Sequence, residues 1–403
     1  MKSIIRKIKK LTLLPLYLRL SITQAFKMMP DNHKKILFTL NDGKVYGEGA
    51  NHGNDRHVYL IINAFNEAGY SVYFYKKRDF ITFSRLGRYG RFIYTLKNVK
   101  FISELPENTK DIILVFDNIQ EDLLSRQWEK LVYINVLKPS FCKVGELITI
   151  PFFMQPLRYY MGQHNNLLML RSHERKIRVF FGGDTSEKWY QNPILKLQGH
   201  LTRSEALNAL LESCPKAKYI EDIKELNGIV NSSQYLNECR IWRADWGNIL
   251  SSRIFVYNWL HIVSRSDFFL CLSGTDFPMC HNAIESMAVG TIPIIAYHDW
   301  FTPPLEHRKN AIVFSGTDDL VRKVNEVFEM SAEEIREMRQ NVIKYYEDHL
   351  NPQSFVRKFE SSAKELNTLM LYPKLVCSDY DNKQAKILLD DLNINLQKHL
   401  KNE

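Results

Sequence analysis

The chain has 403 residues and six cysteines, which excludes a disulfide-stapled mini-protein and gives room for two domains. Apolar residues make up 45% and charged residues 25%, values typical of a globular chain with a substantial core. The formal charge is +9, but seven of the 54 basic residues and no acidic residue lie among the first thirty positions, which leaves 47 basic against 45 acidic residues elsewhere. A protein that binds nucleic acid over its whole body is therefore disfavoured.

Residues 1–30 form a basic segment that we interpret as a membrane-proximal helix. Apolar side chains recur there at helical spacing between the basic ones: Ile4, Ile5, Ile8 and Leu11. The apolar runs are shorter than the roughly 18 residues that a spanning helix needs, so the segment is expected to rest on an anionic membrane surface. The alternative is a basic helix that packs on its own domain.

The six cysteines contain no C-x-x-C pair. Neither a zinc site nor a redox pair is expected from this spacing, so we predict no metal. Unpaired cysteines of this kind suit a reducing cytoplasm, which places the chain on the cytoplasmic side of a membrane.

From residue 35 onward, short apolar strands alternate with helical stretches. The first series comprises a helix over 58–68 and strands over 36–40, 71–75, 112–116, 131–136 and 147–150. This alternation is typical of a parallel α/β sheet. The pattern loosens between residues 155 and 176, so an N-terminal Rossmann-like domain is predicted over 31–165, in the role of an acceptor domain.

A second series of the same kind follows and predicts a C-terminal Rossmann-like domain over 170–345. Its predicted elements are helices over 251–264 and 281–289 and strands over 177–181, 218–223, 268–272, 292–296 and 311–314. Ser331 and Glu334 form a capping box for a helix that Pro352 is expected to stop, and helices are predicted over 346–403. The expected fold class is α/β, with two Rossmann-like domains facing a central cleft.

The turn after the strand at 268–272 is the most informative candidate site. Ligands of open α/β sheets bind beyond the carboxyl ends of the strands, and the amides at a helix N-terminus favour anionic groups. Ser273, Gly274 and Thr275 lie between this strand and the helix that begins near His281. We therefore predict that they approach a phosphate.

The following helix carries three further candidates. His281 and Glu285 are four residues apart on one face, with Asn282 beside them. We predict that this face binds the donor nucleotide and that Glu285 accepts hydrogen bonds from a sugar hydroxyl. The alternative is that His281 and Glu285 pair with each other on a solvated face.

Gly182, Gly183 and Asp184 follow the first strand of the second series directly. Two glycines permit close approach of the backbone to a ligand, so these residues are predicted to bind the donor nucleotide. The segment is neither G-x-G-x-x-G nor G-x-x-x-x-G-K-[ST], and hydride-transfer enzymes and P-loop NTPases are therefore disfavoured.

The loop over 47–57 is dense in glycine, amide, imidazole and charged groups, a composition that is costly to order unless the loop lines a site. Asp55 and His57 are predicted to lie near the reacting hydroxyl. The residues predicted to bind the acceptor are Asn51, His52, Asn54 and Arg56. The alternative is a surface loop in which Asp55 caps the next helix.

A third polar loop, 227–234, is an ordinary turn by composition alone. It contains Ser232, between Asn231 and Ser233.

Three segments together resemble the donor-domain core of a two-Rossmann (GT-B) glycosyltransferase with an exostosin-like character. They are the helix over 251–264, the strand ending at Ser273 and the run A-I-E-S-M-A-V-G-T-I-P-I-I over 283–295. The whole layout, with its basic start, glycine-rich first loop and C-terminal helices, is most similar to the retaining β-Kdo transferase domain of bacterial O-antigen synthases.

This resemblance implies transfer of Kdo from CMP-Kdo to a polyprenyl-linked glycan in lipopolysaccharide synthesis, at the inner face of the bacterial inner membrane, without a metal. It further implies a double displacement in which an aspartate first takes the sugar. The position of that aspartate aligns with Ser232, whose hydroxyl lacks a carboxylate's charge, so the chain is divergent, inactivated or wrongly aligned at this position. Two other functions stay open: an exostosin-like transferase using a UDP- or GDP-sugar, and a non-catalytic glycan-binding relative.

Overall fold

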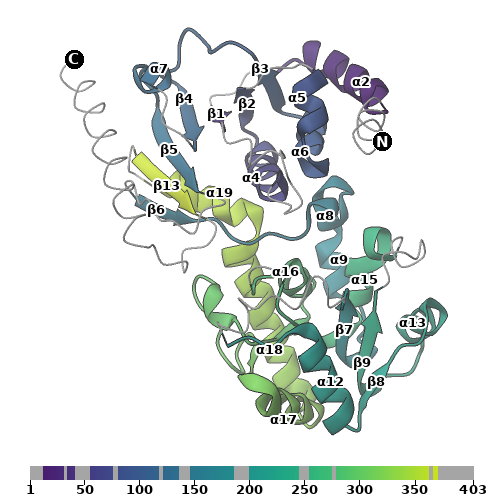
Figure 1. Ribbon diagram of the computed structural model, residues 1–403. Helices are drawn as coiled ribbons and strands as arrows, with labels where there is room; N and C mark the ends of the chain where they lie inside the picture. Colours follow the sequence, from purple (N-terminus) through teal and green to yellow (C-terminus); the bar gives the residue numbers. More distant parts are fainter. Residues whose placement is uncertain are drawn as a thin grey trace. The chain divides into compact units, whose positions relative to one another are not determined.

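The computed structural model divides the chain into two units, which are described separately (Figure 1). Unit 1 comprises residues 1–150 and 352–403, and unit 2 comprises residues 151–351. The described residues are 12–30, 34–40, 55–75, 80–117, 121–135, 146–185, 199–244, 254–274, 278–362 and 366–370.

Unit 1 is built on a seven-stranded sheet in the order β3-β2-β1-β4-β5-β13-β6, and every pairing in it is parallel. The strands are β1 (Lys35–Thr39), β2 (Ser71–Tyr75), β3 (Val99–Ile102), β4 (Ile112–Phe116), β5 (Lys130–Asn135), β6 (Glu146–Thr149) and β13 (Leu366–Met370). Strand β4 is buried along its whole length, as expected of a central strand covered on both faces. The five strands predicted here are confirmed to within one or two residues.

The helices of unit 1 come from both ends of the chain. They are α2 (Leu14–Ala25), α4 (Asp55–Glu67), α5 (Phe80–Arg85), α6 (Arg88–Phe92), the 3₁₀ turn η1 (Ile93–Thr95), α7 (Glu121–Leu124) and α19 (Pro352–Ser361). Phe65 of α4 contacts the rings of Phe355 and Phe359 of α19, with centroids 5.9 and 5.0 Å apart. Helix α19 therefore belongs to the core of unit 1.

Unit 2 contains a six-stranded parallel sheet in the order β12-β11-β10-β7-β9-β8. The strands are β7 (Ile177–Gly183), β8 (Ala217–Tyr219), β9 (Leu236–Arg243), β10 (Ser266–Cys271), β11 (Ile292–Ile295) and β12 (Ile312–Val313). The central strand β10 is fully buried. Strand β9 was not predicted, because its charged side chains break the apolar pattern: Arg240 bonds Glu225 and Glu238 at 3.1 and 2.6 Å.

The helices of unit 2 precede, separate and follow these strands in the sequence. They are α8 (Pro156–Tyr160), η2 (Gln163–Asn166), α9 (Leu167–Arg171), α12 (Arg203–Ser213), α13 (Ile223–Val230), η3 (Ile254–Asn258), α15 (Trp259–Val263), α16 (His281–Ala288), η4 (His298–Trp300), α17 (Gly316–Phe328), α18 (Ala332–Tyr345) and η5 (Tyr346–Leu350). The predicted capping box of α18 is confirmed: Glu334 N donates to Ser331 Oγ at 3.2 Å, and Ser331 N donates to Glu334 Oε2 at 2.9 Å.

Two features of the organisation differ from the prediction: the end of the first unit and the presence of a strand after α19. The first unit ends at residue 150, before the loosened segment, whose helices α8 and α9 belong to unit 2. The predicted stop at Pro352 is confirmed: the preceding helix ends at Leu350, and Pro352 is itself the first residue of α19, where a missing amide hydrogen costs nothing. The residues after α19 include strand β13, inserted between β5 and β6, where only helices were predicted.

The two parallel sheets confirm the predicted fold class of two Rossmann-like α/β domains, the building blocks of GT-B. The predicted cleft concerns the placement of the two units and stays a prediction. Among the residues that the structure describes, no helix is long and apolar enough to cross a bilayer. Within those same ranges, no group of three or more His, Cys, Asp or Glu side chains could hold a metal ion.

Candidate functional site

In unit 2, the carboxyl ends of β7 and β10 and the start of α16 meet at one edge of the sheet. Strand β7 ends at Gly183 and pairs in parallel with β10, which ends at Cys271. Asn282 of α16 donates from Nδ2 to the carbonyl oxygen of Gly182 at 3.3 Å. The structure thus brings together most of the residues predicted to bind the donor nucleotide.

The two glycines of β7 are required by the protein's own packing. A Cβ atom on Gly182 would lie 2.9 Å from Cη2 of Trp259 and 3.0 Å from Cζ of Phe180. A Cβ atom on Gly183 would lie 3.3 Å from Nη1 of Arg203. Gly182 therefore leaves room for an indole, and Gly183 leaves room for a guanidinium.

Arg203 lies at the centre of this edge, and its position was not predicted from the sequence. It is the first residue of α12 and only 3% exposed. Its Nη1 donates to Asp184 O at 2.6 Å, its Nε donates to Ser273 O at 3.0 Å, and its Nη2 lies 3.4 Å from Cys280 Sγ. The guanidinium thus joins the ends of two strands to the start of α16.

The N-terminus of α16 adds positive potential beside Arg203. Within the described residues its N-cap, Cys280, makes no side-chain capping bond, and the first turn of the helix holds no acidic residue. The amide groups of such a helix end attract anions. His281 is held by a contact of 2.8 Å between its Nδ1 and Phe153 O, and it is 9% exposed.

Glu285 lies beneath this edge, fully buried. Its Oε1 accepts from Arg158 Nε at 2.9 Å and from Gln155 N at 3.2 Å, and its Oε2 accepts from Trp259 Nε1 at 2.6 Å. The structure thus gives this carboxylate three protein donors in place of the predicted sugar hydroxyl. The alternative of a solvated pair between His281 and Glu285 is wrong, because both residues are buried.

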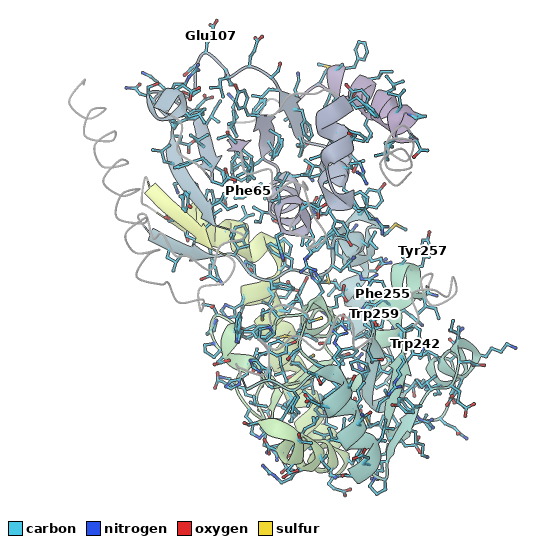
Figure 2. All side chains as sticks on the ribbon, in the orientation of Figure 1. Phe65, Glu107, Trp242, Phe255, Tyr257 and Trp259 are labelled. Atoms are coloured by element: carbon cyan, nitrogen blue, oxygen red, sulfur yellow. The ribbon has the colours of Figure 1, made fainter. Side chains whose placement is uncertain are left out.

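Trp259 connects Glu285 to the sheet, because it donates a hydrogen bond to this carboxylate and packs against strand residues. Its ring contacts Phe255 and Phe269 at centroid distances of 5.5 and 6.0 Å, and Figure 2 labels Phe255 and Trp259 in unit 2. Its outer edge is the group that excludes a side chain at Gly182. The buried carboxylate, the indole and the end of β7 therefore form one rigid floor.

Two arginines hold the other end of α16. Arg171 Nε donates to Ala288 O at 2.8 Å, and Arg175 Nη2 donates to Val289 O at 3.1 Å. Burial lowers the pKa of Arg175 to about 9. Cations at a helix C-terminus are favourable, so these residues fix the helix whose other end faces the candidate site.

One predicted donor residue, Thr275, lies outside the described residues, whereas Ser273 and Gly274 are described and buried. Gly274 N donates to Pro278 O at 3.1 Å, which closes the turn toward α16.

Ser232 lies away from this edge. Residues 227–230 belong to α13, and Ser232 precedes β9, where its Oγ accepts from Gln234 N at 2.9 Å. Because β9 runs parallel to β7, the start of β9 is at the opposite edge of the sheet from Gly183. The structure therefore does not bring Ser232 together with the other donor-site candidates.

In unit 1, Asp55 and His57 are structural residues of α4, each 3% exposed. Asp55 Oδ2 accepts from Tyr89 N at 2.9 Å and Gly90 N at 3.1 Å, so this carboxylate caps α6. The alternative predicted from the sequence was that Asp55 caps the helix that follows the loop, which is α4. Arg56 Nε donates to His57 Nε2 at 3.2 Å. The other predicted acceptor residues, Asn51, His52 and Asn54, lie outside the described residues.

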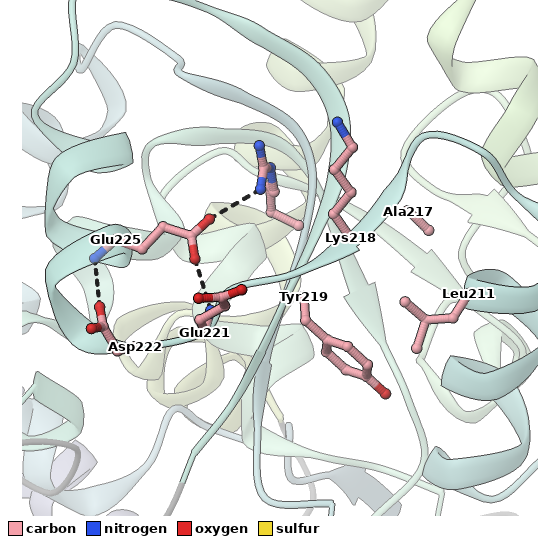
Figure 3. A pocket seen from close by; sticks show the side chains of 8 residues that line it. Leu211, Ala217, Lys218, Tyr219, Glu221, Asp222 and Glu225 are labelled. Atoms are coloured by element: carbon pink, nitrogen blue, oxygen red, sulfur yellow. Dashed lines mark hydrogen bonds and ion pairs between the residues drawn. The ribbon is translucent and has the colours of Figure 1, made fainter.

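A separate hollow of about 730 Å³ lies beside β8 and α13 (Figure 3). Its charged groups bond one another: Arg240 pairs with Glu225, and Glu225 Oε2 accepts from Glu221 N at 2.7 Å. Asp222 Oδ1 accepts from Glu225 N at 2.8 Å and caps α13. These charged groups of the hollow therefore serve the fold of β8, β9 and α13.

No protein-family model matches the sequence, and no curated protein matches it. Among solved structures, Anabaena HepE in complex with UDP is 12% identical with a TM-score of 0.40, over 81% of this chain and 98% of that chain. A glycosyltransferase from Rickettsia africae ESF-5 is 9% identical with a TM-score of 0.42, over 82% and 97%. The lipopolysaccharide outer core galactosyltransferase WaaB is 9% identical with a TM-score of 0.38, over 81% and 98%. Likenesses of this degree do not bear on the chemistry, and the fold assignment rests on the strand order and registers.

Proposed function

We propose that the chain is a glycosyltransferase and that unit 2 binds the phosphate groups of a sugar nucleotide at the carboxyl edge of β7 and β10. The observation that carries this proposal is Arg203, a buried cation tied to Asp184 O and Ser273 O beside the uncapped start of α16. Open parallel sheets bind ligands at this edge, and a helix N-terminus favours phosphate.

The same groups suit the chemistry of glycosyl transfer. When the bond between the sugar and the phosphate breaks, the leaving nucleotide gains negative charge. Fixed positive charge at that point stabilises the transition state more than the bound donor. Arg203 and the amides of α16 would supply it, held rigid by Trp259 and Glu285 beneath them.

We propose CMP-Kdo as the donor and a polyprenyl-linked glycan as the acceptor, with retention of configuration. The support is the resemblance of the chain layout, with its basic start, glycine-rich first loop and C-terminal helices, to retaining β-Kdo transferase domains. Ser232 is not carried forward as the nucleophile, because it lies at the other edge of the sheet. Replacing Ser232 by aspartate is therefore not expected to create activity.

A non-catalytic glycan-binding function is the second candidate, and one observation favours it. Asp55 and His57, the groups predicted to act on the acceptor hydroxyl, are buried within unit 1 and engaged there in hydrogen bonds. A chain of this kind would bind a glycan but would not release nucleotide from any sugar donor.

Calorimetric titration of the full chain with CMP, UDP and GDP tests the donor site. We expect CMP to bind and Arg203→Met to weaken it about tenfold or more, because a charge-assisted hydrogen bond to phosphate is lost. The matched control is Arg240→Met, an arginine of β9 in the same sheet, which should leave the affinity unchanged. Binding of UDP alone contradicts the CMP-Kdo proposal, and equal weakening by both variants contradicts the placement of the site.

A second variant, Cys280→Asp, tests whether a loss of affinity for CMP can be separated from a loss of folding stability. An aspartate at the N-cap stabilises a helix by about 0.5–2 kcal/mol and would pair with Arg203, which lies 3.4 Å from the present Sγ. We expect this variant to unfold at the same or a higher temperature while its affinity for CMP falls. Unchanged affinity would show that phosphate does not bind between Arg203 and α16.

A further inference from the structure

Helix α2 is fixed to unit 1 by a buried glutamine. Gln24 is fully buried; its Nε2 donates to Tyr94 O at 3.0 Å and Val99 O at 3.2 Å, and its Oε1 accepts from Phe101 N at 3.2 Å. A buried amide with three bonds to the backbone around β3 holds the helix firmly. The predicted alternative, a helix packed on its own domain, is therefore correct for this face of α2.

The opposite face of α2 presents an apolar row to solvent. The row consists of Leu14, Leu18 and Ile22 of α2 and of Phe26, the C-cap residue of the helix. They are spaced by four residues and have exposed fractions of 37, 50, 59 and 82%. Residues at this spacing lie one above another on a helix. Most exposed large apolar side chains of a soluble protein occur singly, so an aligned row on one element indicates an interaction surface.

The charge of this part of the chain identifies the partner. The first thirty residues hold seven basic residues and no acidic residue, and Arg19 is exposed beside Leu18. Two copies of such a segment would repel each other, whereas anionic lipid headgroups would attract it. The helix has twelve residues, a rise of about 18 Å, and so cannot cross an apolar layer of about 30 Å.

We propose that this row is the surface by which the chain lies on an anionic bilayer, with α2 parallel to the membrane plane. Because Gln24 holds α2 from the other face, docking inserts the row without detaching the helix from unit 1. The inference does not depend on the proposed donor site, which lies in unit 2.

The test is flotation of the full chain with vesicles of phosphatidylcholine, with and without phosphatidylglycerol. We expect binding to the anionic vesicles that weakens as salt is added. Leu18→Glu and Ile22→Glu should each lower the partition coefficient about tenfold, because each removes an inserted aliphatic side chain and adds a repelled charge. The matched control is Leu168→Glu, which changes an 81% exposed leucine of α9 in unit 2 and should have no effect.

Three results would overturn the proposal. They are equal binding of the α2 variants and the parent chain, equal binding to neutral and anionic vesicles, and a shift from dimer to monomer caused by Ile22→Glu without lipid. The last would assign the row to a second copy of the chain. Calorimetry with CMP on the same variants separates this outcome from failure of the donor site, because α2 variants should bind nucleotide as the parent chain does.

Discussion

At the scale of single residues, the site depends on a buried ion pair. Arg158 and Glu285 are both fully buried, and their 2.9 Å bond is joined by Trp259 on the other carboxylate oxygen. The guanidinium of Arg158 also donates to Phe255 O at 2.6 Å and lies 4.7 Å from the ring centroid of that residue. Such a pair is costly to bury, so its role is to fix one arrangement of α8, α15 and α16.

Glu285→Gln should therefore lower the free energy of unfolding by about 3–5 kcal/mol, because it leaves the buried Arg158 without its counter-charge. Urea unfolding measures this loss. The matched control is Glu333→Gln, whose pair with Arg336 is on the surface, with an expected loss below about 1 kcal/mol. The double variant with Arg158→Met should recover part of the loss, and additive losses would contradict the pairing argument.

The residues of the candidate edge could be predicted only where local sequence determines their position. Gly183 ends β7, Ser273 lies just after β10 and Asn282 lies in the first turn of α16, and the structure places them at one edge as expected. Arg203 could not be found, because its partners Ser273 and Cys280 are 70 and 77 positions away in sequence. Its one local signal was the capping box of Thr202 and Glu205, which marks the start of α12.

Glu285 was misinterpreted for the same reason. Its ionic partner Arg158 is 127 positions away, in a segment that appeared irregular in the sequence. Without that partner, a carboxylate on an apolar helix indicates a ligand.

At the scale of elements, the hydrophobic pattern predicted strands best where apolar residues form a short run that charged residues do not interrupt. The bounds of β2 and β4 were predicted to the residue, since each is a short apolar run between turns. Strand β9 was missed because Glu238 and Arg240 on its outer face pair with each other. Charged pairs on a sheet face stabilise the sheet, but they interrupt the alternation of apolar and polar residues by which a strand is predicted from sequence.

The junction between α9 and β7 contains a histidine that cannot take up a proton easily. His173 Nδ1 lies 2.7 Å from Ser264 Oγ, and this hydroxyl donates to His261 O at 2.7 Å, so His173 must donate to Ser264. Burial, together with the nearby charges of Arg265, His261 and Arg175, lowers the pKa of His173 from 6.5 to about 4.

The pH dependence follows from this shift. Between pH 6.5 and about 4 the unfolded chain binds a proton at His173 that the folded chain does not, so the stability that is present above pH 6.5 is lost as the pH falls. The side chain is partly exposed, and we expect a loss of about 1–2 kcal/mol. In His173→Asn the fall in unfolding free energy over this window should be smaller by that amount. Equal falls in both proteins would contradict the assignment, and the difference between them should be constant above pH 7.

At the scale of the whole molecule, the path of the chain was the hardest feature to predict. The interrupted apolar pattern of residues 155–176 predicts a domain boundary there. The interruptions, however, include arginines that form hydrogen bonds with α16 and its C-cap within unit 2. The return of residues 352–370 to unit 1 has no local signal, because β13 pairs with strands more than 200 positions earlier. The hydrophobic pattern predicts which helices and strands form, but it does not predict which sheet a strand joins.

This path makes the two units unequal as isolated fragments. Unit 2 is a continuous stretch, whereas unit 1 needs β13 to join β6 to β5 and needs α19 to cover Phe65. Lys34 also bonds Glu360 at 2.7 Å. We therefore expect fragment 151–351 to unfold cooperatively by circular dichroism and fragment 1–150 to show no cooperative transition. Chains that end at Met370 and at Asn351 give the matched comparison, since they differ by α19, β13 and the residues between. If the shorter chain keeps amide-exchange protection in β1 and β4 equal to that of the longer one, the C-terminal return is not what completes the core of unit 1.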